Sequence, residues 1–405
     1  MENINLKKFF LPYILVLLIS SIFFLYIKHD VANDSSISEW LINYKGGFTR
    51  RGIGGELAIF LSFLFDIALR DSIFLIQTLI QSLYLITIYF IFKDLKTNKV
   101  LLLAIFAPIF LLYPIAELEV LGRKENFLFL LFSVSILFST KNFSKLTLNI
   151  FLFFSLPVAC LLWEQVILYF PFFAIVTIFK NNLKNFNDVF KKLFLIFSPS
   201  IIVILLIWFS PLTLSERDIM CSYLETKFSE KCYMSAILLV NNDIYFSTFD
   251  VVHKNATPIH YIRYALIFII GFLPINFLIY KNYFLKKENY IEKNFSLKIL
   301  FLILYLPSIL LFIFGYDWGR WINITYSFTI LLYIFLFSNS LVSDKSYSKQ
   351  KILKNFFNNK TLFLILFIIF SFGWNPKTVI TGDIASFPGY RIPVKIINYF
   401  SSGYF

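Results

Sequence analysis

The stretch FFLPYILVLLISSIFFLYI, Phe9 to Ile27, is almost entirely apolar and is long enough to cross a lipid bilayer as a helix. It follows Lys7 and Lys8 as a signal peptide would, yet no small-residue cleavage site appears and the chain runs directly into Lys28. The sequence therefore predicts a retained first membrane helix, with the N-terminus in the cytoplasm.

Apolar runs of this kind recur along the whole chain. Hydrophobic residues make up 58% of the 405 residues and the mean hydropathy is +0.74, which excludes an ordinary soluble domain. We predict an all-α, polytopic membrane protein with about eleven spans in one transmembrane domain, residues 1–405. The predicted spans are 9–27, 71–92, 100–115, 126–140, 146–163, 165–179, 193–209, 261–280, 297–315, 323–340 and 361–374.

The two kinds of basic residue fall on opposite sides of this topology. All eight arginines lie on the external side, whereas 21 of the 29 lysines lie on the cytoplasmic side, where positive charge anchors helices. The net charge of +13 therefore reflects membrane orientation and not nucleic-acid binding. Because guanidinium groups suit bidentate recognition of phosphate and pyrophosphate, function is expected on the external side.

The predicted external segments are 28–70, 116–125, 210–260, 316–322 and the tail 375–405. Residues 53–69 are apolar, but a span there would place the later lysines outside, so we predict an external interfacial helix. Cys221 and Cys232 share one external segment, and the sequence leaves open whether they pair. Cys160 lies inside a predicted span, where we expect inert packing.

A glycine-rich motif follows the first span. Residues 44–56 hold five glycines within ten positions, next to Arg50 and Arg51. Glycine permits positive φ angles and close backbone approach, so the motif suits a cradle for a phosphorylated headgroup. The alternative is a flexible turn whose two arginines meet lipid phosphates.

A second motif, residues 116–125, places five charged residues in a short external turn. The alternative interpretation is a solvent-exposed turn in which these acids and bases form ion pairs with one another. Four of its residues are candidates for substrate binding: Glu119, Arg123, Lys124 and Glu125.

The third motif, residues 316–323, places Asp317, Trp318 and Arg320 in a short gap between two spans. Ionisable groups at membrane depth are costly and tend to be functional, although a structural pair of Asp317 with Arg320 is the alternative. Glu164, beside Trp163, is a further candidate for substrate binding, or it caps the preceding helix.

Several familiar chemistries have no motif in this chain. It contains no Walker loop, no Gly-x-Ser-x-Gly elbow and no His-Glu-x-x-His sequence, which argues against an ATPase, a serine hydrolase and a zinc protease. His253 and His260 lack the close spacing of metal ligands. We predict neither a metal nor another cofactor.

Carboxylates, arginines and aromatic rings at the external membrane surface suit a substrate that combines a lipid tail, a phosphate and a sugar. The acidic first external loop, the interfacial helix and the large later loop make the chain resemble the GT-C class of polyprenyl-phosphate-sugar glycosyltransferases. Its size, helix count and composition also resemble those of bacterial O-antigen and capsule repeat-unit polymerases.

The resemblance carries expectations about individual residues. In GT-C enzymes an acid of the first external loop is the usual catalytic base, which implies Asp30, Asp34 or Glu39, with Asp317 as a further candidate from its own motif. The first loop holds no tight Asp-x-Asp pair, which puts a metal-assisted reaction in doubt. The polymerases rely on external arginines, and four arginines match by type and side: Arg50, Arg51, Arg123 and Arg320.

The leading hypothesis is a glycosyltransferase of the bacterial inner membrane that acts at the periplasmic face and polymerises O-antigen or capsule repeat units of surface polysaccharide. The expected partners are an undecaprenyl-pyrophosphate- or polyprenyl-phosphate-linked sugar, membrane lipid and other polysaccharide-assembly proteins, but no nucleic acid. The C-terminus is expected in the periplasm. The alternatives are a GT-C enzyme that adds a single sugar and a flippase for lipid-linked oligosaccharides.

Overall fold

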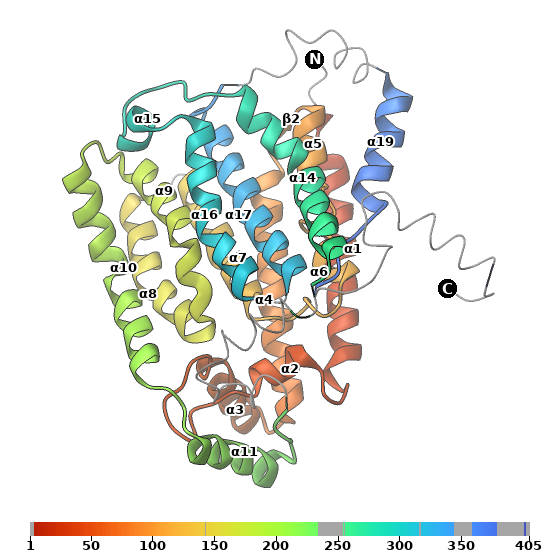
Figure 1. Ribbon diagram of the computed structural model, residues 1–405, viewed down its shortest axis with the longest axis vertical. Helices are drawn as coiled ribbons and strands as arrows, with labels where there is room; N and C mark the ends of the chain where they lie inside the picture. The colour runs from red at the N-terminus through yellow and green to blue at the C-terminus, as the bar shows by residue number, and fades with distance from the viewer. Residues whose placement is uncertain are drawn as a thin grey trace.

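The computed structural model describes residues 4–141, 143–233, 254, 256–315, 317–343, 359–378 and 401. Within these ranges the chain is a bundle of α-helices with one small antiparallel sheet, in which β1 (Ile4–Asn5) pairs with β2 (Lys96–Thr97) (Figure 1). The predicted all-α class is confirmed. Residues 234–253, with His253, lie outside the described residues. So do Tyr316 and the tail beyond residue 378 apart from residue 401, with Arg391.

Among the described residues, six helices are long and apolar enough to cross a membrane, which confirms the membrane-spanning class. They are α1 (Lys7–His29), α4 (Leu69–Phe92), α8 (Lys145–Leu162), α10 (Phe186–Phe209), α14 (Pro258–Lys281) and α17 (Trp318–Ser338).

The remaining helices are mostly shorter, although α16 equals α8 in length. The apolar ones are α3 (Ile53–Phe65), α5 (Lys99–Ile105), α6 (Tyr113–Ala116), α7 (Glu125–Thr140), the 3-10 helix η1 (Glu164–Tyr169), α9 (Phe170–Asn181), α16 (Leu297–Phe314) and α19 (Lys360–Phe372). The more polar ones are α2 (Ser35–Trp40), α11 (Leu214–Phe228) and α15 (Tyr290–Asn294).

Helix α17 lies at the centre of the bundle. Nearly every residue from Trp318 to Leu336 is buried, and the helix packs against α7, α9, α14 and α16. Helix α10 is the opposite case, because only four of its residues are buried and apolar side chains such as Leu205 and Trp208 are exposed. A helix that is apolar on its outer surface suits contact with lipid, whereas a helix buried on all sides forms the core.

The predicted span 100–115 is not a continuous helix. It consists of α5 and α6 joined by turns, and its carbonyl groups are bonded by side chains of α17. Asn323 Nδ2 donates to the carbonyls of Ile109 and Phe110 at 3.0 and 3.2 Å, and Tyr326 donates to Ala104 O at 2.7 Å. Irregular backbone inside a membrane is tolerated only where other protein groups form hydrogen bonds with its polar atoms. The side chains of the central helix α17 provide these bonds here.

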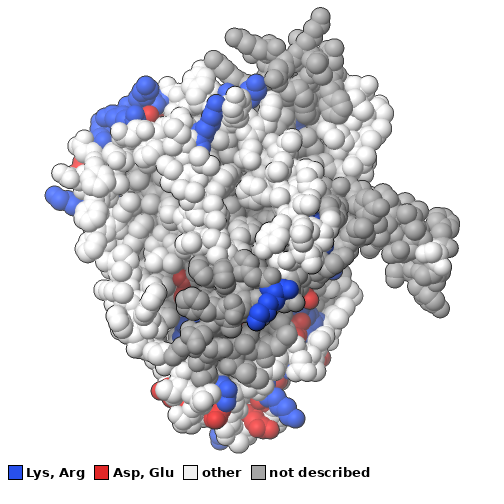
Figure 2. Space-filling view, in the orientation of Figure 1, with Lys and Arg blue, Asp and Glu red and all other residues white. Residues whose placement is uncertain are grey.

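The two ends of the bundle differ in their charged residues. The end that carries α2, α3 and α11 is called the arginine end, and the end with β2, α15 and the lysine-rich connections is called the lysine end (Figure 1). On the face drawn in Figure 2, charged side chains gather toward these two ends and a broad band between them is largely without charge. The uncharged band is what a bilayer core requires.

The arginine end carries the predicted extra helix and a disulfide. Helix α3 buries Ala58 and Ile59 on one face and exposes Phe60 and Phe63 on the other, so the helix exists as predicted, while its interfacial position stays a prediction. Cys221 and Cys232 form a disulfide with a Cα–Cα distance of 5.4 Å, and free Cys160 is buried as expected.

Candidate functional site

The turn 117–124 is held in place by hydrogen bonds to one glycine carbonyl. Gly122 O accepts from Trp40 Nε1 at 2.8 Å and from Gln77 Nε2 at 2.9 Å. Gly122 has φ +81°, and a Cβ atom at this position would lie 2.8 Å from the Gln77 side chain. Glycine is therefore required, and the fixed turn sets the positions of Arg123 and Lys124.

Arg123 forms a buried ion pair with Glu39 of α2. Arg123 Nη1 donates to Glu39 Oε1 at 2.5 Å, and Nη2 donates to Ser35 Oγ at 2.7 Å. Burial alone would raise the pKa of Glu39, but Arg123 and the nearby Arg320, Arg51 and Lys124 together lower this pKa to about 2. Glu39 is thus a permanent anion that orients Arg123.

Arg320, near the start of α17, joins two acids. Its Nε donates to Glu125 Oε1 at 2.6 Å, and its Nη1 donates to Asp317 Oδ2 at 2.6 Å. The side chains of Arg320 and Glu125 are 6% and 1% exposed, whereas Asp317 is 24% exposed. The Arg320–Asp317 pair foreseen as an alternative does form, and it extends to Glu125, whose second oxygen has no hydrogen-bond partner among the described residues.

Arg51 and Glu164 form a bidentate pair. Arg51 Nε and Nη2 donate to the two carboxylate oxygens of Glu164 at 2.8 and 2.7 Å, and Arg50 lies 3.8 Å from the same carboxylate. Burial would raise the pKa of Glu164, but the two arginines lower it to about 2. The predicted spans 146–163 and 165–179 leave little room for a loop at Glu164, and in the structure only Trp163 separates α8 from η1.

Lys124 is fully buried and lies between these pairs. Its Nζ donates to Arg51 O at 2.6 Å and lies 5.5 Å from the centre of the Trp40 ring. Desolvation is the main cause that lowers the pKa of Lys124 to about 7, with Arg51 adding to it, while Glu39, Glu164 and Glu125 act in the opposite direction. The lysine therefore titrates near neutral pH.

Two indole rings connect the Arg51 pair to the Arg320 group. Trp163 and Trp321 stack with their ring centres 6.2 Å apart and an angle of 16° between the rings. Trp163 precedes Glu164, and Arg320 lies 5.0 Å from the Trp321 ring. Trp321 Nε1 is buried without a hydrogen-bond partner among the described residues, which is uncommon and calls for an explanation such as a ligand or water.

These side chains form one group, here called the charged cluster, on segments far apart in the sequence. It contains four acids and five basic residues: Glu39, Glu125, Glu164, Asp317, Arg50, Arg51, Arg123, Lys124 and Arg320. All nine are among the candidates from sequence. The four arginines equal the four acids in number, and Lys124, whose pKa is lowered to about 7, adds a positive charge when it is protonated, which favours an anionic ligand.

The other four sequence candidates lie outside the charged cluster. Asp34 accepts hydrogen bonds at the start of α2 and pairs with Lys28 at 3.5 Å, so its visible role is structural. Asp30 is 80% exposed beside His29, and Glu119 is exposed and contacts Arg123 through its carbonyl. Trp318 donates its indole N–H to Phe312 O.

The glycine-rich loop is packed against the protein itself. A Cβ atom on Gly52 would lie 2.2 Å from the Tyr44 ring, and a Cβ atom on Gly46 would lie 1.9 Å from the carbonyl oxygen of Glu216 in α11. Glu56 closes the loop by accepting from the backbone N–H of Tyr44 at 2.8 Å. The space left by the missing side chains of Gly46 and Gly52 is therefore filled by other segments of this chain.

A smaller polar group that sequence reasoning did not select lies beside Asp317. Glu117 is 3.5 Å from Lys377, whose carbonyl accepts from Tyr264 OH at 3.0 Å, and buried Arg263 lies over the Tyr264 ring. Glu117 belongs to the quoted motif 116–125 and Arg263 is one of the eight external arginines, so the signal was present in the charge pattern.

In the part of the chain that the structure describes, no three His, Cys, Asp or Glu side chains lie close enough together to hold a metal ion. The acids of the charged cluster are instead held by arginines. No protein-family model matches this chain, and neither the curated proteins nor the solved structures contain a match.

Proposed function

We propose that this protein is a glycosyltransferase of the bacterial inner membrane that acts on polyprenyl-linked sugars, with a GT-C-like arrangement and its arginine end in the periplasm. The polymerisation of O-antigen or capsule repeat units is the form of the reaction that we favour. The observation that carries the proposal is the charged cluster, in which three arginine–acid pairs and a buried lysine converge at one end of a membrane bundle.

The orientation rests on two features. The lysine-rich connections that the structure describes gather at the end opposite the charged cluster (Figure 1), as the positive-inside rule expects of a cytoplasmic face. The Cys221–Cys232 disulfide lies beyond α10 in the segment that carries α11, at the arginine end, and disulfides form in oxidising compartments such as the periplasm.

The chemistry of glycosyl transfer from a lipid pyrophosphate matches these groups. An acceptor hydroxyl forms a bond to the anomeric carbon, the bond from that carbon to the phosphate oxygen breaks, and the lipid pyrophosphate leaves with the electron pair. Arg50 and Arg51 suit the developing negative charge. The stacked rings of Trp163 and Trp321 suit a sugar face.

Asp317 is the acid that we assign as the proton acceptor. A general base must reach the acceptor hydroxyl, and Asp317 is the most exposed acid of the charged cluster at 24%. Glu39 and Glu164, with pKa values lowered to about 2 and with arginines bonded to them, are better suited to holding those arginines in position.

The proposal is tested by the banding pattern of surface polysaccharide in the native host. Arg50 is partly exposed and 3.8 Å from its carboxylate, so Arg50→Ala should fold while removing one positive charge from the charged cluster. We expect the ladder of repeat-unit bands to be lost, with a fall in polymer of roughly tenfold or more by the usual worth of a charge-assisted contact. The protein level is followed by immunoblot of the membrane fraction.

The matched control is Arg217→Ala, which removes a partly exposed arginine at the same end whose side chain is bonded to its neighbour Asp218 at 2.6 Å. This variant should keep the ladder. A collapse to core plus one repeat supports polymerisation, whereas loss of all repeat-bearing bands points to a single-sugar transferase or a flippase. A wild-type ladder from Arg50→Ala and Asp317→Asn alike would contradict the proposal.

A further inference from the structure

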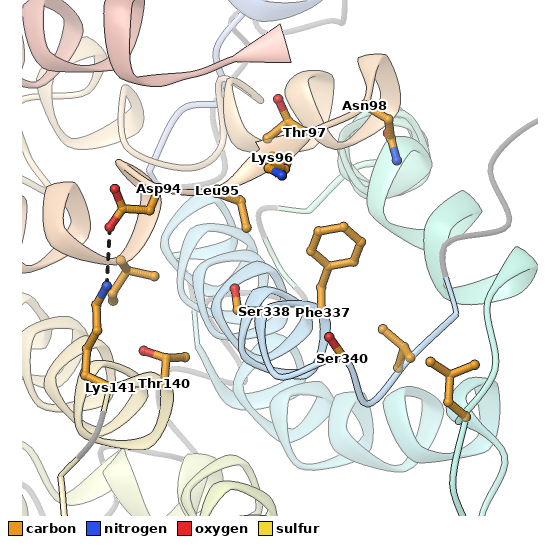
Figure 3. A pocket seen from close by; sticks show the side chains of 13 residues that line it. Asp94, Leu95, Lys96, Thr97, Asn98, Thr140, Lys141, Phe337, Ser338 and Ser340 are labelled. Carbon is orange, nitrogen blue, oxygen red and sulfur yellow. Dashed lines mark hydrogen bonds and ion pairs between the residues drawn. The ribbon is translucent and has the colours of Figure 1, made fainter. Parts of the chain in front are cut away.

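A separate cavity of about 610 Å³ opens at the lysine end (Figure 3). The charged cluster, at the start of α17, lies toward the other end of the bundle (Figure 1). Phe337, Ser338 and Ser340 at the end of α17 form one wall. Residues 94–98 between α4 and α5 form a second wall, and Thr140 and Lys141 complete the rim at the end of α7. A volume of this size lies within the range of roughly 300 to 1,000 Å³ that is typical of small-molecule sites.

The cavity is built by two fixed stretches of backbone. On one side, Lys96 and Thr97 pair with β1. On the other, the chain turns at Ser340, which has φ +53°, and returns to bridge Phe284 with Val342. A left-handed conformation at a residue other than glycine carries a conformational cost, so neighbouring contacts must hold this turn in place.

The lining of the cavity suits an anion with a polar body. Lys96 is exposed, and Lys141 is 43% exposed and lies 3.4 Å from Asp94, which is itself 61% exposed. An ion pair with this geometry is weak, so an entering anion can compete for the lysine. Lys180 Nζ lies 3.4 Å from the carbonyl of Lys141 and adds further positive charge to the rim.

Neutral donors and an aromatic wall complete the lining. Hydroxyl groups of Ser338 and Ser340 are the kind of donor that phosphate oxygens accept from, together with lysine, whereas the Thr140 hydroxyl donates to Leu137 O at 3.3 Å. The ring of Phe337 supplies an apolar surface against which a sugar, a base or a glycerol body can lie.

We propose that this cavity is a binding site for a phosphate ester of small-molecule size, entering from the lysine end. The site is independent of the transferase proposed above, because no residue of the charged cluster lines it. A soluble phosphate ester and the headgroup of an anionic phospholipid share this chemistry, and basic pockets between membrane helices on the cytoplasmic side are known to hold lipid headgroups.

The test uses the full-length protein in phosphatidylcholine nanodiscs. The soluble probe is glycerol 3-phosphate, whose binding is measured by calorimetry, and the lipid probe is phosphatidylglycerol, whose retention is measured by native mass spectrometry. The double variant Lys96→Glu/Lys141→Glu reverses the charge of the rim, and Ser338→Trp fills the cavity without changing its charge. The control, Lys184→Glu/Lys287→Glu, reverses two exposed lysines of the same end that do not line the cavity.

We expect at least one probe to bind the wild type and the control, with affinity or retention lower by about tenfold in both cavity variants. Binding of glycerol 3-phosphate identifies a soluble ester as the source, and retention of phosphatidylglycerol alone identifies the lipid headgroup. The proposal is overturned if neither probe binds the wild type, or if the control loses as much binding as Ser338→Trp and the rim double variant.

Discussion

Lys124 is a fully buried lysine whose charge depends on pH near neutrality. Desolvation lowers its pKa from 10.5 to about 7. Between those two values the unfolded chain holds a proton at this site that the folded protein lacks, so the stability of the fold should rise as pH increases through this window. The acids beside it, Glu39 and Glu164, have pKa values of about 2 and do not titrate there.

The variant Lys124→Met removes this titration. Relative to Lys124→Met, the wild type should gain stability between pH 7 and 10, with a slope of at most about 1.4 kcal/mol per pH unit. Thermal unfolding in detergent across this pH range measures the difference. Lys287→Met, at an exposed lysine, should run parallel to the wild type, and a parallel curve for Lys124→Met as well would show that Lys124 keeps an ordinary pKa.

At the scale of single residues, sequence reasoning selected all nine members of the charged cluster, but the only pair it named was Asp317 with Arg320, as an alternative. The charge pattern and the predicted membrane side made Glu39 and Arg123 candidates independently of each other, because each lies in an external segment. Their contact joins residues 84 positions apart and depends on the turn that Gly122 fixes. Spacing along a chain carries no information about such a pairing between distant segments.

At the scale of elements, the broken segment α5–α6 depends on polar side chains of α17. Asn323→Leu removes the donor to the carbonyls of Ile109 and Phe110 and leaves them buried without that bond. The expected cost is about 1–3 kcal/mol for unsatisfied buried groups, seen as a lower unfolding temperature of the purified protein.

The control is Asn294→Leu, at an exposed asparagine of α15 that donates to the carbonyl of Tyr290 at 2.7 Å. It should leave the unfolding temperature nearly unchanged, because water replaces the lost bond. Equal unfolding temperatures for Asn323→Leu and the wild type would mean that α17 does not hold the broken segment.

Hydropathy predicts membrane helices well where the apolar run is also regular. Six of the predicted spans coincide with long helices such as α4 and α14. The run 100–115 is as apolar as these, but it contains Pro108 and Pro114, which cannot donate a backbone hydrogen bond. A count of apolar residues ignores this property, but α14 contains Pro274 and is still one continuous helix, so the prolines predict the break only together with the polar side chains of α17 that bond the freed carbonyls.

At the scale of the whole molecule, each end of the bundle carries its own kind of basic residue. The arginine end holds Arg51, Arg123 and Arg320 in buried pairs with acids, while most of the described lysines at the lysine end are exposed. Buried pairs are costly to assemble and costly to break, at about 3–5 kcal/mol when one partner is removed. Buried ion pairs that are concentrated at one end of the bundle are expected of a site that must hold charges in fixed positions.

The most direct test of the proposed transferase is reconstitution of the purified protein with an undecaprenyl-pyrophosphate-linked repeat unit from its native host. The account predicts lipid-linked products longer by whole repeat units, together with release of undecaprenyl pyrophosphate, and a strong loss of both with Asp317→Asn. Wild-type protein that is folded and binds the lipid-linked repeat but releases no pyrophosphate and lengthens no chain would contradict it.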